Sequence, residues 1–347
     1  MSRPNKLEDF SINDLYNEIK LRENTERSLD DITDIALERT NEELPVISNE
    51  AGNEALRAFK TSEIIESLKS KQKAIWGEDN RIEIRDIENP DIFNAPDSQD
   101  ILSAADSVVA LFNDDKVIDN GNGTSTLQTE IFGTALRLCS TEKFRHQPIG
   151  AFCSGFLVAP DVIATAGHCV TADNVTNIRF VFGFRMIDDS KARTDISNSE
   201  IYKGARLIGR QENESEADWA LVQLDRVVTN HKPLPIRRTG KIDDNESLYV
   251  IGHPVGLPTK FADGANVKDN ENEAYFVATL DTYGGNSGSP VFNREKHIVE
   301  GILVRGATDF VMNGNCRVSL ICSDLNCNGE ECTRTTLFAD HVPIIDM

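Results

Sequence analysis

Residues 281–292 read Asp-Thr-Tyr-Gly-Gly-Asn-Ser-Gly-Ser-Pro-Val-Phe, and the fold is inferred outward from this stretch. Small residues crowd around one hydroxyl, that of Ser287. Glycines let a backbone take positive φ angles, so such a loop can approach a substrate closely. It can also direct successive N–H groups at one point, which a developing oxyanion requires. The stretch therefore predicts that Ser287 is a nucleophile.

A serine hydroxyl is a weak nucleophile and needs a general base. Two upstream segments each place a candidate side chain beside an apolar strand. His168 stands in Thr-Ala-Gly-His-Cys (165–169), and Asp218 opens Asp-Trp-Ala-Leu-Val-Gln-Leu (218–224). In a catalytic triad the histidine takes the proton of the serine, and the aspartate fixes the tautomer of the histidine. The predicted catalytic residues are therefore His168, Asp218 and Ser287.

The three segments, in the order His, Asp, Ser, resemble the chymotrypsin-like (trypsin-like) serine peptidases. The motifs that carry the resemblance are TAGHC, DWALVQLD and GGNSGSP. The resemblance implies an all-β fold of two six-stranded antiparallel barrels, with the active site in the cleft between them. His168 and Asp218 would come from the first barrel and Ser287 from the second. The resemblance also implies an oxyanion hole formed by the N–H groups of Gly285 and Ser287, and no metal or organic cofactor.

The strand pattern fits this fold. From Ser107 onward, short alternating apolar runs are separated by Gly, Asn and Asp turns. This spacing is typical of closed antiparallel barrels rather than of a βαβ sheet. We expect a peptidase domain at residues 74–347, with barrels at roughly 100–230 and 235–345.

An acidic segment, residues 1–73, precedes that domain. Its apolar residues recur near helical spacing, which predicts a short α-helical segment. A solvated arm, a propeptide and a regulatory docking module are all open for it, and Lys69, Lys71 and Lys73 would offer an activating protease a basic site. Residues 75–81 resemble the mature start of the bacterial glutamyl-endopeptidase branch, which is the nearest branch of the family.

Three residues are predicted to shape the substrate pocket: Asp281, Thr282 and Leu303. Thr282 matches a position that binds the substrate carboxylate in glutamate-specific relatives, but Leu303 stands where they carry histidine. Asp281 lies where trypsin-like members keep the acid that pairs with substrate arginine or lysine. A carboxylate in the pocket would favour a cationic side chain. Asn286 replaces the aspartate that pairs with a new amino terminus in the pancreatic enzymes, so activation by that ion pair is excluded.

The seven cysteines lie between Cys139 and Cys332. In the family, the spacing of Cys153 and Cys169 forms a disulfide beside the catalytic histidine, and we expect the same here. The last four cysteines do not have the paired Cys-x-x-Cys spacing of a zinc site, so a disulfide-stapled loop is the better interpretation. These four are Cys316, Cys322, Cys327 and Cys332. Cys139 would be left over or would pair with one of them.

The amino-acid composition argues against some classes of binding partner. The chain has 347 residues and a formal net charge of −21, which argues against nucleic acid as a ligand. No apolar run approaches the ~20 residues that cross a bilayer, so no membrane insertion is expected. The first residues lack the apolar core of a secretory signal, which favours a cytoplasmic protein if Met1 is the native start. The cysteines slightly favour an extracytoplasmic site, secreted or periplasmic.

The sequence thus predicts a serine endopeptidase that acts on protein or peptide substrates, made as a zymogen and cleaving after basic residues. Two alternatives are open. One is an intracellular protease switch whose N-terminal segment is a docking module. The other is a catalytically silent homologue that holds a peptide in the same cleft.

Overall fold

The computed structural model describes residues 59–60, 75–76, 79–212, 217–305, 309–322 and 329–344. The helices predicted for the N-terminal segment lie outside these residues. The chain divides into two compact units, Met1–Lys71 and Gln72–Met347. The elements described below belong to the second unit.

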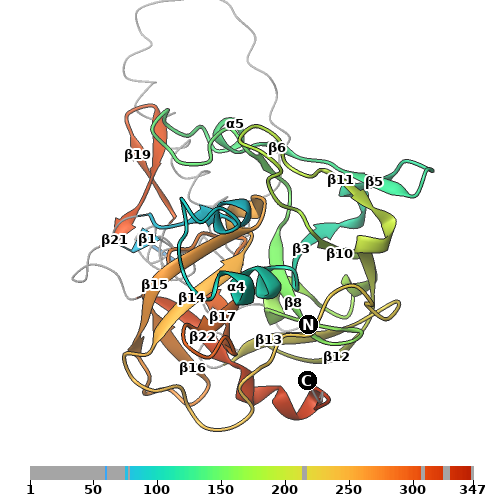
Figure 1. Ribbon diagram of the computed structural model, residues 1–347, viewed down its shortest axis with the longest axis vertical. Helices are drawn as coiled ribbons and strands as arrows, with labels where there is room; N and C mark the ends of the chain where they lie inside the picture. Colours follow the sequence, from blue (N-terminus) through green and yellow to red (C-terminus); the bar gives the residue numbers. More distant parts are fainter. Residues whose placement is uncertain are drawn as a thin grey trace, which may run out of the picture. The chain divides into compact units, whose positions relative to one another are not determined.

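Six antiparallel strands close the first barrel in the spatial order β10-β12-β13-β9-β8-β3 (Figure 1). They are β3 (Val108–Asn113), β8 (Cys153–Ala159), β9 (Val162–Thr165), β10 (Ile178–Phe182), β12 (Ile201–Glu212) and β13 (Asp218–Leu224). All seven residues of β8 are buried. A strand shows continuous burial when both of its faces are covered. By contrast, most residues of β12 are exposed or half-buried, and the strand carries two register shifts against β13.

The second barrel has the order β14-β17-β18-β22-β16-β15 and closes through pairing of β14 with β15. Its strands are β14 (Ser247–Gly252), β15 (Lys260–Asp269), β16 (Tyr275–Ala278), β17 (Pro290–Asn293), β18 (Val299–Arg305) and β22 (Glu330–Arg334). A short strand from the beginning of the unit, β2 (Ile82–Glu83), adds to the outside of β15. Two closed six-stranded barrels confirm the predicted all-β fold.

Smaller sheets decorate the barrels. They are β4 (Val117–Asp119) with β5 (Thr124–Leu127) and β11 (Asp195–Ser197), β6 (Glu130–Ile131) with β7 (Pro148–Ile149), β19 (Phe310–Asn313) with β20 (Cys316–Ser319), and β1 (Ile75–Trp76) with β21 (Ile321–Cys322). Residues 126–132 read as one strand-like run in the sequence, but the structure divides this run. β5 ends at Leu127, and the buried Phe132 begins a helical turn whose Gly133 donates its N–H to the carbonyl of Arg145.

The helices are few and short. They are α3 (Ile84–Ile87), α4 (Ser98–Ala105) and α5 (Phe132–Ala135), with 3₁₀ turns η3 (Asp114–Lys116), η4 (Gly167–Cys169), η5 (Val175–Asn177), η6 (Asn198–Glu200), η7 (Pro254–Gly256), η8 (Thr335–Leu337) and η9 (Ala339–His341). In α4 the buried residues Ile101, Ala104 and Ala105 follow helical spacing, so one face of the helix packs on the core.

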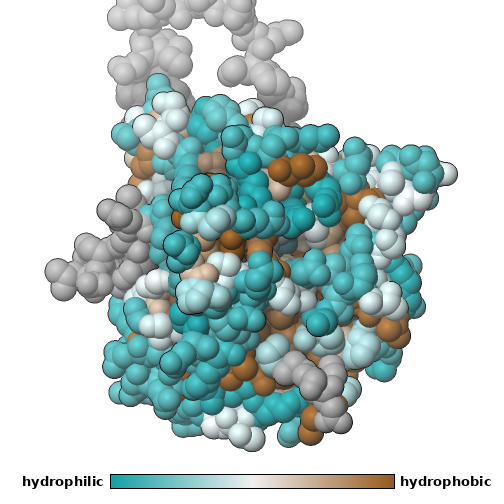
Figure 2. Space-filling view, viewed as in Figure 1, coloured by the Kyte–Doolittle hydropathy of each residue, from teal (hydrophilic) through white to brown (hydrophobic). Residues whose placement is uncertain are grey.

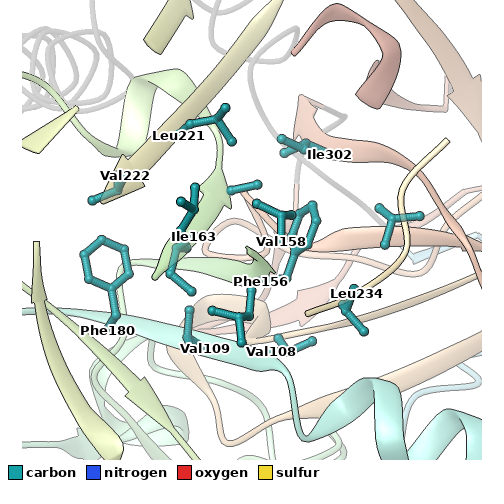
Figure 3. Close-up of a cluster of buried hydrophobic side chains, with 14 of the residues drawn as sticks. Val108, Val109, Phe156, Val158, Ile163, Phe180, Leu221, Val222, Leu234 and Ile302 are labelled. Atoms are coloured by element: carbon teal, nitrogen blue, oxygen red, sulfur yellow. The ribbon is translucent and has the colours of Figure 1, made fainter. Parts of the chain in front are cut away.

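One apolar core runs through both barrels (Figure 3). In it, Phe156 and Ile163 of the first barrel belong to the same cluster as Ile302 of the second. Leu234, in the segment that connects the barrels, also belongs to this cluster, and its N–H donates to the carbonyl of Leu157 at 2.8 Å. This shared core holds the two barrels, and hence the loops at their junction, against each other.

The surface agrees with the acidic composition. The face in Figure 2 is largely hydrophilic, with apolar side chains in small separate groups. Among the described residues, no helix has the length and hydropathy needed to cross a membrane.

Candidate active site

His168 and Asp218 meet at one end of the first barrel. β9 ends at Thr165, and the 3₁₀ turn η4 that follows presents His168. Nδ1 of His168 lies 2.6 Å from Oδ2 of Asp218, and the backbone N–H of His168 donates to Oδ1 at 3.0 Å. The side chain of His168 is 35% exposed and that of Asp218 only 6%. The carboxylate therefore engages Nδ1 from the buried side and leaves Nε2 for a reacting group.

The second barrel supports Asp218. The backbone N–H of Asp218 donates to Oγ1 of Thr333, on β22, at 3.1 Å. Burial by itself would raise the pKa of Asp218, but the charge and hydrogen bonds of His168, with the charge of Arg305, hold that pKa below its ordinary value. Asp218 is thus kept ionised, as an orienting acid must be.

Ser287 lies in the loop between β16 and β17 and faces the histidine segment. Its carbonyl oxygen accepts the N–H of Ser154, on β8, at 2.8 Å. The same oxygen lies 3.8 Å from Sγ of Cys169, the residue after His168. The second barrel therefore brings its serine loop against β8 and against the turn that carries His168.

At Gly288 the serine loop passes so close to the first barrel that there is no room for a side chain. The φ of Gly288 is +90°, and a Cβ at this position would lie 2.0 Å from the carbonyl oxygen of Ser154 and 2.3 Å from Oγ1 of Thr165. Any larger residue would push the serine loop away from the first barrel.

The two residues before Ser287 differ in how their backbone N–H groups are bonded. Gly285 has a φ of +82°, and within the described part of the chain no group accepts its N–H. The next N–H, of Asn286, is occupied by the carbonyl of Tyr283 at 3.1 Å. The bend of the loop thus leaves the N–H of Gly285 able to donate to a ligand, while the N–H of Asn286 is used within the loop.

The three predicted pocket residues are all buried. Asp281 is 3% exposed and accepts the backbone N–H of Asn80 at 3.0 Å. Thr282 donates its hydroxyl to Oε2 of Glu330 at 2.9 Å. Leu303 packs in the apolar core of the second barrel.

Sequence reasoning missed two acids beside this loop. Glu330, on β22, is 2% exposed. Asp309 accepts the N–H of Gly284 at 2.9 Å. Asp309 precedes the cysteine-containing segment and Glu330 lies within it, two residues before Cys332. No local pattern predicts that either carboxylate will fold back onto the serine loop.

The comparisons bear on this geometry. Residues 153–302 match the family model of the trypsin-like peptidase domain. Together with the two barrels, this match supports a chymotrypsin-like serine peptidase. No curated protein matches the chain. The glutamyl-endopeptidase branch stays a prediction.

One solved structure with some similarity is titled "Structure of Vibrio cholerae VesB protease". It shares 14% sequence identity, with a TM-score of 0.40. The match covers 68% of this chain and 62% of that one, so the chain spans less than two thirds of the length of this protease.

Two disulfides join segments of the described residues. Cys153 is bonded to Cys169, which confirms the predicted pair beside His168. Cys139 is bonded to Cys316, across 177 residues, and ties the segment after α5 to the β19–β20 hairpin. Cys327 and the side chain of Cys322 lie outside the described residues.

The disulfide also bears on metal binding. Potential ligand atoms of Cys153, His168 and Cys169 lie within 4.8 Å of one another. Because the two sulfurs are bonded to each other, they offer no thiolate, and this group does not suit a metal.

Two other histidines have structural contacts. His253 is fully buried, and its Nδ1 lies 2.9 Å from the carbonyl oxygen of Leu257. Burial lowers the pKa of His253 to about 4, so this ring is neutral at physiological pH. His231 lies between two carboxylates, with Nδ1 2.8 Å from Asp106 and Nε2 2.6 Å from Glu200.

Proposed function

We propose that the chain is a serine endopeptidase that hydrolyses peptide bonds through an acyl-enzyme on Ser287. The observation that carries the proposal is the 2.6 Å contact between His168 and Asp218, next to a serine loop held against the same segment. The match to the trypsin-like peptidase domain supports it independently, because that match does not depend on side-chain geometry.

Each residue then has a defined role. Nε2 of His168 takes the proton of Ser287 as Oγ attacks the scissile carbonyl. The N–H groups of Gly285 and Ser287 bind the oxyanion, and one such donor is worth about 10²–10³ in kcat. Protonated His168 then gives the proton to the leaving amine. Water repeats the sequence and releases the acid, while Asp218 stabilises the imidazolium.

For specificity we propose cleavage after arginine or lysine. Asp281 lies six residues before Ser287, and Asp309 and Glu330 hydrogen-bond Gly284 and Thr282 of the same loop. A site that gathers carboxylates favours a cationic partner and disfavours an acidic one. Leu303 supplies no charge for a substrate glutamate, so small or apolar substrate side chains rank second and glutamate last.

The N-terminal segment is proposed to be removed by an activating protease near Lys73. The alternative is a retained docking module. The two differ in whether the full chain is active.

Hydrolysis of a mixed peptide library tests the proposal. The full chain, a chain trimmed near Lys73 and the matched Ser287→Ala variant would be compared. Cleavage after arginine or lysine by the trimmed chain alone supports both basic specificity and a zymogen. Free cleavage by the full chain favours the docking module. Cleavage after glutamate would refute the role of Asp281.

The silent peptide-binding homologue remains the rival function. It predicts no cleavage by either form and no reaction with an active-serine phosphonate. A phosphonate adduct on the native chain would exclude it.

A further inference from the structure

Arg81 is a buried cation close to the serine loop. It is only 1% exposed, and it immediately precedes β2 on the edge of β15. Its guanidinium pairs with Asp79 in a forked arrangement, with Nε 2.8 Å from Oδ1 and Nη2 2.7 Å from Oδ2. Removing a guanidinium from water is unfavourable even when it is paired. The cost of burying Arg81 must therefore be offset by further interactions.

Tyr283 makes one such interaction with Arg81. The guanidinium carbon of Arg81 lies 4.0 Å from the centroid of the Tyr283 ring. Tyr283 is 1% exposed and lies in the serine loop, where its carbonyl accepts the N–H of Asn286 at 3.1 Å. A cation–π contact is strongest when both groups are removed from water, as they are here. The contact thus fixes the residue whose carbonyl sets the bend at Gly285.

The neighbouring residue makes a second anchor. Asn80 donates its backbone N–H to Asp281 at 3.0 Å. Two consecutive residues, Asn80 and Arg81, therefore hold two positions of the same loop, Asp281 and Tyr283.

The opposite side of Tyr283 is also held. Its hydroxyl hydrogen-bonds Ser319, and its ring lies 4.8 Å from that of Phe310. Ser319 and Phe310 belong to the hairpin that the Cys139–Cys316 disulfide fastens. Tyr283 is thus clamped between the hairpin and Arg81.

We propose that Asn80 and Arg81 are positioning residues that hold residues 281–288 in the shape that presents Ser287 and the N–H of Gly285. The donor to Asp281 is the peptide N–H of Asn80 and not a free amino terminus, so this contact does not require cleavage of the chain at residue 80. The proposal rests on the proposed function, because it assigns the loop a catalytic shape.

The experiment compares Arg81→Ala, Arg81→Lys and Tyr283→Leu with the wild-type chain. Two quantities are measured: the rate of labelling by an active-serine phosphonate, and deuterium exchange of the amides of residues 281–288. Arg294→Ala is the matched control. Arg294 also pairs with an acid of the early chain, Asp97, and faces a tyrosine ring, that of Tyr249 at 5.8 Å.

Arg81→Ala is expected to slow labelling at least about tenfold and to speed exchange in residues 281–288. Arg81→Lys should recover part of the labelling rate, because a cation above the ring remains. Arg294→Ala should change labelling less than about threefold, since that contact lies outside the loop. If Arg81→Ala does not fold, Tyr283→Leu removes the same contact from the other partner and must show the same two effects.

Wild-type labelling and exchange for a folded Arg81→Ala would overturn the proposal. Equal losses in Arg81→Ala and Arg294→Ala would also overturn it, because they would show only lost global stability. If the wild-type chain is not labelled, the proposed function fails, while the exchange measurement still decides whether Arg81 orders the loop.

Discussion

The carboxylate of Asp218 binds His168 twice, at Nδ1 of the ring, 2.6 Å away, and at the backbone N–H, 3.0 Å away. One side chain therefore fixes both the tautomer of the imidazole and the turn that carries it. Because the N–H of Asp218 is accepted by Thr333 of the second barrel, this pair also depends on how the barrels meet.

Replacing Asp218 with asparagine tests this double contact. An amide can present its NH₂ group to Nδ1 and so stabilise the wrong tautomer, which lowers kcat by about 10⁴-fold with little change in KM. Steady-state kinetics of Asp218→Asn against the wild type would measure this. Thr333→Val is the milder comparison, since it removes only the acceptor of the Asp218 N–H. A loss in Asp218→Asn no larger than in Thr333→Val would contradict the role of the carboxylate.

Gly288→Ala is expected to disrupt the junction between the barrels. The new Cβ would overlap the carbonyl of Ser154, 2.0 Å away, in addition to the strain of a φ of +90°. Gly123→Ala is the control, because its φ is +86° but nothing lies within 4 Å of its Cβ. We expect Gly123→Ala to lower the free energy of unfolding by about 1 kcal/mol and Gly288→Ala by about 3 kcal/mol or more. Similar losses in urea unfolding would contradict the crowding at Gly288.

His231 is expected to make stability depend on pH. Burial opposes its protonation, but the hydrogen bonds with Asp106 and Glu200 outweigh burial and raise the pKa of His231 to about 9. A pKa above that of the unfolded chain stabilises the folded state below about pH 6.5, and this stabilisation is lost as the pH rises through about 9.

The wild-type free energy of unfolding should therefore fall by about 1–3 kcal/mol more than that of His231→Gln between pH 6 and 9.5. The lower part of that range allows for solvent screening, since the Asp106 side chain is 62% exposed. Urea unfolding at both pH values measures it, with the exposed His146→Gln as control. Parallel curves for wild type and His231→Gln would show that the ring carries no charge.

The Cys139–Cys316 disulfide should stabilise the hairpin next to Tyr283. Removing it by Cys139→Ser with Cys316→Ser is expected to lower the free energy of unfolding by about 2–5 kcal/mol. Because Ser319 lies in the same hairpin and bonds Tyr283, phosphonate labelling should slow as well. Unchanged labelling in the folded double variant would show that the disulfide does not influence the serine loop through the hairpin.

The motifs around His168, Asp218 and Ser287 predicted the barrel architecture because they resemble those of the chymotrypsin-like peptidases, and the two closed barrels confirm it. The Cys153–Cys169 disulfide followed from the family resemblance, and the structure forms it. The short helix α4 was not predicted, although its buried apolar residues follow helical spacing in the sequence.

The surroundings of Tyr283 could not be predicted. Arg81 and Asp79 stand in a charged stretch that is usual for solvent, and only the pairing of β2 with β15 carries that stretch into the interior. Glu330 likewise becomes a buried partner of Thr282 through the return of β22. These contacts join residues far apart in sequence, which local pattern does not encode.

The most direct test of the central claim is to locate the phosphonate adduct by mass spectrometry. The account predicts one adduct, on Ser287, absent in Ser287→Ala and formed at least about 10³-fold more slowly in His168→Ala. Ser289→Ala is the matched control, because Ser289 is fully buried and hydrogen-bonds Asn286. A labelled chain without modified Ser287, or labelling that survives in Ser287→Ala, would contradict the account.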